Sequence, residues 1–320
     1  MSAATVLTEP MRDAISRSGY LMEQRLVPLV ESFGFKATPN ERFRDYETGQ
    51  LRELDIGAIG GIRISNRRYD FVLPVLLVAC KNLSCPLVFF TQKEIRMDFF
   101  LGPVQVSGLP MQIIRPRKPK QALPYFLNLE KFHHYYRTGR LASQFCAVYE
   151  SKKHDQKKGQ LPTFEAGHTI AGRIELFQDF DALAKAVVAY RRDHGQSFHL
   201  DKNGEDLNLQ FYYPIFVTSG PLVECFIGRR RPEYRRVHRI GFLLRTRVGQ
   251  EHRDFRIDVV DETGLQRLLG TINEETTKIA DRIRRQRRII NHSLAWTTRK
   301  LARRKPDFQR AYVSGEAELS

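Results

Sequence analysis

The sequence predicts an α/β protein in which a mixed central β-sheet is flanked by helices. Residues 71–81 form a strongly apolar run of strand length, typical of a strand buried on both faces. Residues 178–194 repeat apolar side chains at steps of three and four, as an amphipathic helix does. The chain has 320 residues and an apolar fraction of 42%, so a substantial core is expected.

The N-terminal part is predicted to hold one helix and several strands. Residues 1–17 are mixed in character and predict a loose arm. Ser18 is a suitable N-cap for a helix over 19–33, which Gly34 would end. Turn residues then separate apolar or alternating segments, which predict strands at 35–46, 51–59, 71–81 and 86–91.

The rest of the chain alternates loops, helices and strands. A loop is expected over 102–121, where four prolines accompany the basic residues Arg115, Arg117, Lys118 and Lys120. Helices are predicted over 123–136, 178–194 and, as one long basic region, 263–305. A Lys-rich surface loop is expected at 150–160. Strands are predicted at 143–149, 211–218, 222–227, 237–246 and 255–260. The turn residues Gly220 and Pro221 favour a hairpin between 211–218 and 222–227.

Four parts follow from this order: an N-terminal arm (1–17), a core (18–150), an α/β extension with the basic helical region (151–305) and a C-terminal tail (306–320). The sequence has no apolar stretch of about eighteen residues and no secretory signal at its start, so it predicts a cytoplasmic protein without a membrane partner. The four cysteines form no CxxC pair, which favours small buried thiols over disulfides or a zinc site.

Positive charge is the strongest compositional signal. The chain has 52 Lys and Arg against 36 Asp and Glu, a formal charge of +16, which favours a polyanionic partner and above all nucleic acid. The alternative is a basic solvated surface without a specific partner. Arginines gather in two places and are predicted to contact phosphates: Arg229, Arg230, Arg231, Arg235 and Arg236 at a strand turn, then Arg284, Arg285, Arg287 and Arg288 in a run nearly free of acids, unlike an ordinary solvated helix face.

Three ionisable residues form a candidate catalytic group. Asp55 lies on one predicted strand, Lys81 ends another, and Glu23 lies on the preceding helix. If these elements pack together, the carboxylates can hold Mg²⁺, which prefers oxygen ligands, and the lysine can orient an attacking water or stabilise negative charge. The simpler interpretation is an Asp55–Lys81 structural ion pair beside a sheet, with Glu23 as a solvated helix charge.

The order of these segments resembles the PD-(D/E)xK, or restriction-endonuclease-like, nuclease superfamily. The matching pieces are Ser18-Gly19-Tyr20-Leu21-Met22-Glu23, Arg52-Glu53-Leu54-Asp55 and Val78-Ala79-Cys80-Lys81-Asn82. The resemblance covers roughly residues 15–150, including the predicted helix and strand at 123–149. It implies a restriction-endonuclease-like core at 18–150. It also implies that Glu23 is the helix acid, Asp55 the central metal ligand and Lys81 the catalytic lysine, with Glu23 and Asp55 holding Mg²⁺ or Mn²⁺.

Ala79 departs from the family pattern, because the family has an acidic residue two positions before the lysine. A methyl group cannot bind a cation. Three explanations are open: a natural member that has lost catalysis and binds nucleic acid, an enzyme whose missing acid has moved, or a substitution that traps an uncleaved complex. For a moved acid, Glu53 is the nearest candidate on the same face as Asp55, and Asp70 is another.

The sequence therefore predicts a metal-dependent nuclease that hydrolyses phosphodiester bonds of nucleic acid, with DNA favoured over RNA. The alternative is a catalytically lapsed nucleic-acid-binding or assembly subunit. A partner protein or a homo-oligomer is compatible with either. His133 and His134 are interpreted as a helix end, since adjacent residues on a helix point apart and would not share a metal.

Overall fold

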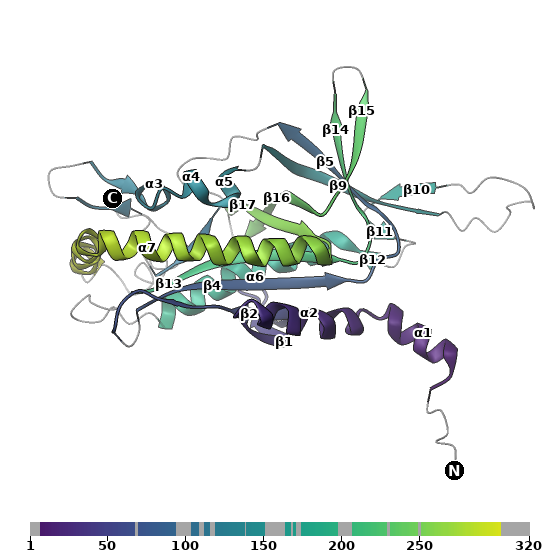
Figure 1. Ribbon diagram of the computed structural model, residues 1–320, viewed down its shortest axis with the longest axis horizontal. Coiled ribbons are helices and arrows are strands. Elements are labelled where there is room, and N and C mark those ends of the chain that lie inside the picture. Colours follow the sequence, from purple (N-terminus) through teal and green to yellow (C-terminus); the bar gives the residue numbers. More distant parts are fainter. Residues whose placement is uncertain are drawn as a thin grey trace, which may run out of the picture.

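The computed structural model shows one large mixed β-sheet between helices (Figure 1). It describes residues 7–67, 70–93, 104–108, 112–115, 119–137, 139–150, 164–167, 169–170, 174–197, 207–228, 231–248 and 251–301. The predicted tail at 306–320 and nearly all of the loop predicted at 150–160 lie outside these residues. The helices are α1 (Glu9–Arg17), α2 (Tyr20–Ser32), α3 (Leu123–Phe126), α4 (Leu129–Phe132), α5 (His134–Arg137), α6 (Leu176–Ser197) and α7 (Glu262–Leu301).

Ten strands of the 13-stranded sheet follow one path, β1-β2-β4-β13-β17-β16-β9-β5-β14-β15. The sheet joins strands from before and after residue 150, and the predicted division into parts stays a prediction. The strands are β1 (Lys36–Arg44), β2 (Leu51–Ile59), β3 (Ile62–Arg63), β4 (Phe71–Lys81), β5 (Leu87–Lys93), β6 (Gln105–Ser107), β7 (Gln112–Ile113), β8 (Gln121–Ala122), β9 (Arg140–Glu150), β10 (Phe164–Gly167), β11 (Thr169–Ile170), β12 (Ile174–Glu175), β13 (Asn208–Thr218), β14 (Leu222–Ile227), β15 (Pro232–Val237), β16 (Arg239–Val248) and β17 (Glu251–Val260).

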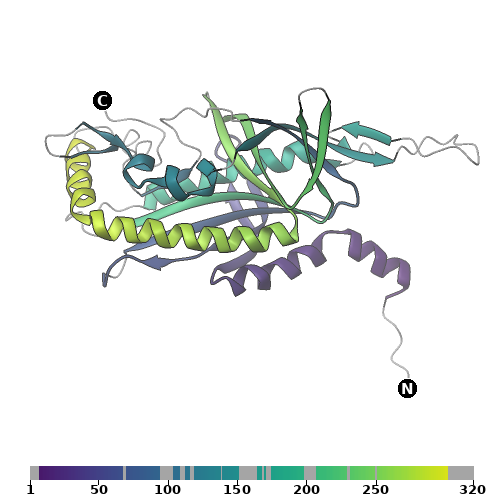
Figure 2. The same ribbon diagram turned by 45° about the horizontal axis from the view of Figure 1, so that its top comes forward.

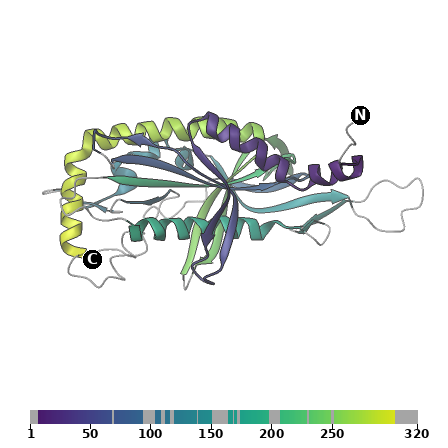
Figure 3. The ribbon, with the colours of Figure 1, turned by 90° about the horizontal axis from the view of Figure 1, so that it is seen from below.

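Strand β4 separates two apolar layers, as its sequence predicts. Val72, Leu76 and Val78 pack into a core that includes side chains of α2 and α7, whereas Val75 and Leu77 pack into a core that includes α6. Figure 3 shows α2 and α7 on one side of the sheet and α6 on the other. Burying one such side chain stabilises the fold by about 1.5–3 kcal/mol, so the apolar run fixes the centre of the molecule.

A crossover connection follows β4 and returns to its side. Strand β13 pairs in parallel with the whole of β4, from Asn208 beside Phe71 to Thr218 beside Lys81. Helix α6 immediately precedes β13 in the order of elements and packs on both strands. The chain between β4 and α6 contributes β5 and β9 to the same sheet. The order α2-β1-β2-β4-α6-β13 thus forms one layered unit into which other elements are inserted.

Most predicted elements are confirmed, including the helices at α2, α6 and α7, but four predictions are wrong. The loop predicted over 102–121 contains strands β6 and β7 and the start of β8. The arm at 1–17 contains helix α1. The helix predicted over 123–136 is three short helices, since Asn128 has a left-handed φ of 56° and His133 is extended. Strands β13 and β14 do not form a hairpin, because β13 pairs with β4 and β17 while β14 pairs with β5 and β15.

Other composition-based expectations have plain outcomes. All four cysteines are free, and Cys80, Cys85 and Cys225 are buried. Among the described residues, no helix combines the length and the apolar character needed to cross a bilayer. Strand β14 forms a hairpin with β15 rather than with β13. This β14–β15 hairpin projects beyond the neighbouring strands, as Figure 1 and Figure 2 show from two directions.

Helix α7 is tied to the start of β4 by a buried ion pair. Arg287 Nη1 lies 2.6 Å from Asp70 Oδ2, and Asp70 is fully buried. The Leu207 N–H and the Ser65 hydroxyl also donate to this carboxylate. Burial raises the pKa of Asp70, but these donors and the Arg287 charge outweigh it and hold the pKa below its usual range.

Two arginines two residues apart on α7 provide a matched test of this ion pair. Arg287→Ala is expected to lower the free energy of unfolding by about 3 kcal/mol, because it leaves a buried carboxylate without its cation. Arg285 is exposed, so Arg285→Ala should change it by less than about 0.5 kcal/mol. Urea unfolding followed by circular dichroism measures the unfolding free energy of both variants. Equal losses would show that the Arg287–Asp70 ion pair does not stabilise the fold.

The same ion pair predicts a dependence of stability on pH. A carboxylate whose pKa is depressed in the folded state stabilises the fold above its unfolded pKa and loses that contribution as the pH falls through the folded value. The difference in unfolding free energy between wild type and Asp70→Asn should therefore be full at pH 6 and shrink below about pH 4. A constant difference down to pH 3 would show that charge does not carry the effect.

Candidate functional site

A polar pocket lies at the carboxyl end of β4, where strand β2 leaves its neighbour. Strands β2 and β4 pair from Ile59 beside Val75 to Ile56 beside Val78 and no further. Beyond that point the Asp55 carboxylate accepts a hydrogen bond from the Cys80 N–H. Across from Asp55, Asn40 of β1 has a left-handed φ of 51° and interrupts the β1–β2 pairing. The divergence of β2 from β4 therefore opens the sheet at Asp55.

The pocket has a volume of about 520 Å³ and is lined by residues of five elements, α2, β1, β2, β4 and α6, and of the turns beside them. Helix α2 and the turn before it supply one wall, β2 and the end of β4 the floor, and the first turn of α6 the opposite wall. Three residues predicted as catalytic, Glu23, Asp55 and Lys81, meet here, as does Glu53. The full lining is Ser18, Gly19, Tyr20, Glu23, Asn40, Glu53, Asp55, Cys80, Lys81, Asn82, Leu83, Gln178 and Asp179.

The carboxylates of the pocket disfavour one another's ionisation. Burial raises the pKa of Glu23, and the charges of Asp55 and Glu53 raise it further. Burial also raises the pKa of Asp55, with Asp179 and Glu53 adding to the effect against the Cys80 hydrogen bond and Lys81. Negative charges that are crowded and partly buried in this way are stabilised by a cation.

Asp179 is the acidic residue that the sequence analysis missed. It lies in the first turn of α6, and its Oδ1 is 2.9 Å from Lys81 Nζ. Burial raises the pKa of Asp179, and Lys81 opposes this shift. The only sequence signal was its place at the start of the predicted helix, before the apolar stripe. Nothing local in the sequence indicates that α6 begins beside Lys81, since that follows from the packing of α6 on β4.

Ala79 and Asp70 do not reach the pocket. Ala79 is 9% exposed and belongs to the apolar core shared with α6. Asp70 precedes the first residue of β4 and is bound by Arg287, so the eleven residues of the strand put it about 35 Å from Lys81. Asp70 as the relocated acid is therefore wrong. Lys81 forms its ion pair with Asp179. The simpler interpretation of the sequence, a structural ion pair between Lys81 and Asp55, is therefore wrong.

The predicted phosphate-binding arginines fall into two groups, and none of those within the described residues lines the pocket. Helix α7 runs antiparallel to β4: Glu262 at its start contacts Arg25 of α2, and Arg287 reaches Asp70. The predicted arginines of α7 therefore lie toward the end of β4 remote from Lys81. Arg284 donates to the Arg63 and Ile64 carbonyls and Arg287 binds Asp70, so both serve the fold. Arg284, Arg285 and Arg288 are all exposed.

The other arginine group lies on the β14–β15 hairpin. Arg231, Arg235 and Arg236 are exposed there, and Arg235 pairs with Glu224. Arg229 and Arg230 lie outside the described residues. Ile227 and Tyr234, also exposed at 77% and 67%, share the hairpin, so it combines cations with large uncharged side chains. Such a surface suits a nucleic-acid backbone and its bases.

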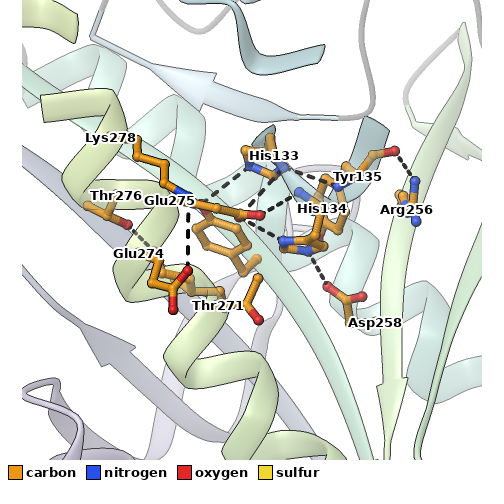
Figure 4. A network of polar contacts seen from close by, with 12 residues as sticks. His133, His134, Tyr135, Arg256, Asp258, Thr271, Glu274, Glu275, Thr276 and Lys278 are labelled. Carbon is orange, nitrogen blue, oxygen red and sulfur yellow. Dashed lines mark hydrogen bonds and ion pairs between the residues drawn. The ribbon is translucent and has the colours of Figure 1, made fainter. Parts of the chain in front are cut away.

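A second polar cluster is buried between α5, β17 and α7 (Figure 4). His134 contacts two carboxylates, Glu275 at 2.7 Å through Nδ1 and Asp258 at 3.0 Å through Nε2. The rings of His133 and His134 stack 4.9 Å apart. The helix-end interpretation is confirmed, but the expectation that these side chains diverge is wrong, because a break between α4 and α5 separates them.

This cluster has its own compensating charges. His133, His134 and Glu275 bring ligand atoms within 4.8 Å of one another, a spacing at which a metal could bind. However, the Tyr135 N–H donates to His133 Nδ1, which suits a neutral ring, and burial lowers the pKa of His133 well below its usual value. Burial raises the pKa of Asp258, but Arg239 and His134 hold it far below its usual range. We interpret this His133–His134 cluster as a set of buried polar contacts that holds α5, β17 and α7 together.

Substitutions of two adjacent glutamates on α7 test whether the His133–His134 cluster stabilises the fold. Glu275→Ala is expected to cost about 3 kcal/mol of unfolding free energy, because His134 loses a buried carboxylate partner. Glu274 is exposed and lies 4.0 Å from Lys278, so Glu274→Ala should cost less than about 0.5 kcal/mol. Chemical unfolding at pH 7 gives both values. A Glu275→Ala protein as stable as wild type would mean that the cluster does not hold α7 in place.

Comparisons of the chain with protein-family models, with curated proteins and with solved structures find no match.

Proposed function

We propose that the chain is a metal-dependent nuclease that hydrolyses phosphodiester bonds of nucleic acid, with DNA favoured over RNA. The observation that carries the proposal is the convergence of Glu23, Asp55 and Lys81 on one pocket from α2, β2 and β4. These residues are far apart in the sequence and come together in the order that the resemblance to PD-(D/E)xK nucleases requires. The unit α2-β1-β2-β4-α6-β13 supports a restriction-endonuclease-like core, but its helix and strand after β4 come from 176–218 rather than from 123–149, so the core extends beyond the predicted bounds of 18–150.

The donor atoms of the pocket are of the type that Mg²⁺ or Mn²⁺ prefers, and no three of its described acidic side chains already lie within the 4.8 Å spacing that the His133 cluster meets, so binding would draw them together. Glu23, Glu53, Asp55 and Asp179 all offer carboxylate oxygens, the ligands that these cations prefer. Cys80 also lines the pocket, but burial raises the pKa of its thiol well above its usual value, so it remains a poor metal ligand. A cation held by Asp55 and Glu23 would act as a Lewis acid toward a phosphoryl oxygen and a bound water.

The remaining steps belong to residues of the chain. The Cys80 N–H fixes one oxygen of Asp55, so the carboxylate is oriented before any ligand arrives. The Lys81 ammonium stands at the same pocket and can hold the attacking water or stabilise charge that develops on the phosphoryl group. Tyr20, 66% exposed at the rim, offers a face on which a base can stack.

The activity is tested with purified wild type on a plasmid and on labelled RNA, with Mg²⁺, Mn²⁺ or chelator. We expect metal-dependent cleavage of DNA. Asp55→Asn and Lys81→Ala are expected to lower the rate about 100-fold or more, because each removes a group that acts on the reacting phosphate. Lys131→Ala, at an exposed site on α4, is the matched control and should cleave like wild type. Cleavage that survives both pocket substitutions would refute the assignment.

A lapsed nucleic-acid-binding subunit is the second candidate, and Ala79 is the observation that favours it. The variant Ala79→Glu restores the acidic residue of the family pattern. Cleavage by Ala79→Glu but not by wild type would establish that the natural site has lost a ligand or carries a substitution. Binding without cleavage by both proteins would exclude the enzyme and leave the binding subunit.

Nucleic-acid binding is tested by its dependence on salt. Affinity for a labelled duplex should fall by about 0.9 log units per log unit of salt for each phosphate contact. The double variant Arg231→Ala/Arg236→Ala should reduce this slope by about 1.8, because two exposed hairpin cations are lost. Arg245→Ala is the control, since Arg245 is already neutralised by Asp254 at 2.7 Å. Fluorescence anisotropy gives the slopes. A double variant with the same slope as wild type would show that the β14–β15 hairpin does not contact the nucleic acid.

A further inference from the structure

Strand β4 lacks an acidic ligand on the face that carries its lysine. Ala79 and Lys81 are two residues apart and therefore project from the same face. That face packs against α6, and Ala79 lies in the same apolar core as Leu176 and Phe180 of that helix. A ligand missing from β4 at this position can therefore be replaced from α6.

Asp179 is the residue of α6 placed to do so. It directly precedes Phe180, which packs in the core with Ala79, and it lines the pocket with Asp55 and Glu23. Oδ1 bonds Lys81, while Oδ2 is buried and has no hydrogen-bond partner among the described residues. A buried carboxylate oxygen without a donor is costly, so the geometry indicates a ligand that the protein chain does not itself supply.

We propose that Asp179 provides, from α6, the metal-binding carboxylate that Ala79 cannot, and that the side chains of Glu23, Asp55 and Asp179, which line one pocket, draw together around one divalent cation beside Lys81 when it binds. This inference rests on the proposed nuclease site and deepens it. It departs from the family pattern, in which the acid and the lysine share a strand. It also explains how Ala79 and a working site can occur in the same chain, and it makes the moved acid the preferred explanation.

Cation affinity tests the proposal independently of cleavage. Mn²⁺ binding to the full chain is measured by titration calorimetry, with circular dichroism to confirm folding. Asp179→Asn is nearly isosteric and should weaken Mn²⁺ binding at least about tenfold, the lower end of what even indirect metal partners cost. Asp181→Asn is the matched control on the same helix, since Asp181 bonds Lys185 and Thr246 instead, and it should bind Mn²⁺ like wild type.

A double variant sharpens the test. Ala79→Glu in the wild-type background places a carboxylate beside Asp179 and should not improve binding. Ala79→Glu combined with Asp179→Ala moves the ligand back to β4 and should recover Mn²⁺ affinity to within about threefold of wild type. Such rescue is a non-additive coupling between two positions, which a purely structural Lys81–Asp179 ion pair would not produce.

The outcomes separate this inference from the proposed function. If Asp179→Asn binds Mn²⁺ like wild type while Asp55→Asn does not, Asp179 is only the ion-pair partner of Lys81 and the inference fails, but the nuclease site stands. If Asp179→Asn weakens binding and no variant cleaves nucleic acid, the cation site stands and the nuclease function fails. If Mn²⁺ does not bind wild type, or Asp55→Asn leaves binding unchanged, both fail.

Discussion

A single backbone N–H links the fold of this protein to its candidate site. Both faces of β4 are buried, and β13 pairs with its whole length on one edge. On the other edge β2 leaves before Cys80, whose N–H would lose its partner strand. Asp55 accepts that hydrogen bond with its side chain. A buried donor without a partner is costly, so the acid that orients the pocket also satisfies a requirement of the sheet.

This arrangement explains which site residues the sequence could predict. Asp55 and Lys81 stand at recognisable places in strand patterns, and Glu23 lies in a helix with a clear apolar stripe, so local patterns suffice to select them. Asp179 was not predictable, because its relation to Lys81 depends on where α6 packs after a long insertion. The failed hairpin between β13 and β14 has the same origin, since pairing partners are chosen by the whole sheet rather than by the intervening turn.

The count of charged residues does not predict where the arginines lie or what they contact. Arg284 and Arg287 belong to an acid-poor run, which favours phosphate contacts, yet they bind carbonyl groups near β3 and the buried Asp70. Those partners are distant in sequence, so composition cannot reveal them. The antiparallel course of α7 then sets Arg285 and Arg288 away from the pocket. Any nucleic acid that touches both regions must extend over roughly the length of β4, about 35 Å, which favours a polymer over a short fragment.

Helix α7 also determines where Glu23 stands. Leu26 and Val30 of α2 pack in the same core as Leu265 and Leu269 of α7, and Asn273 donates to the Phe33 carbonyl at the end of α2. The exposed Arg25–Glu262 pair adds little, so packing and the Asn273 bond set the position of α2. The register of α7 is in turn fixed by buried polar contacts, Glu275 with His134 and Arg287 with Asp70. Because apolar packing alone tolerates sliding of one helix past a sheet, these contacts connect the distant end of α7 to the placement of an acid in the pocket.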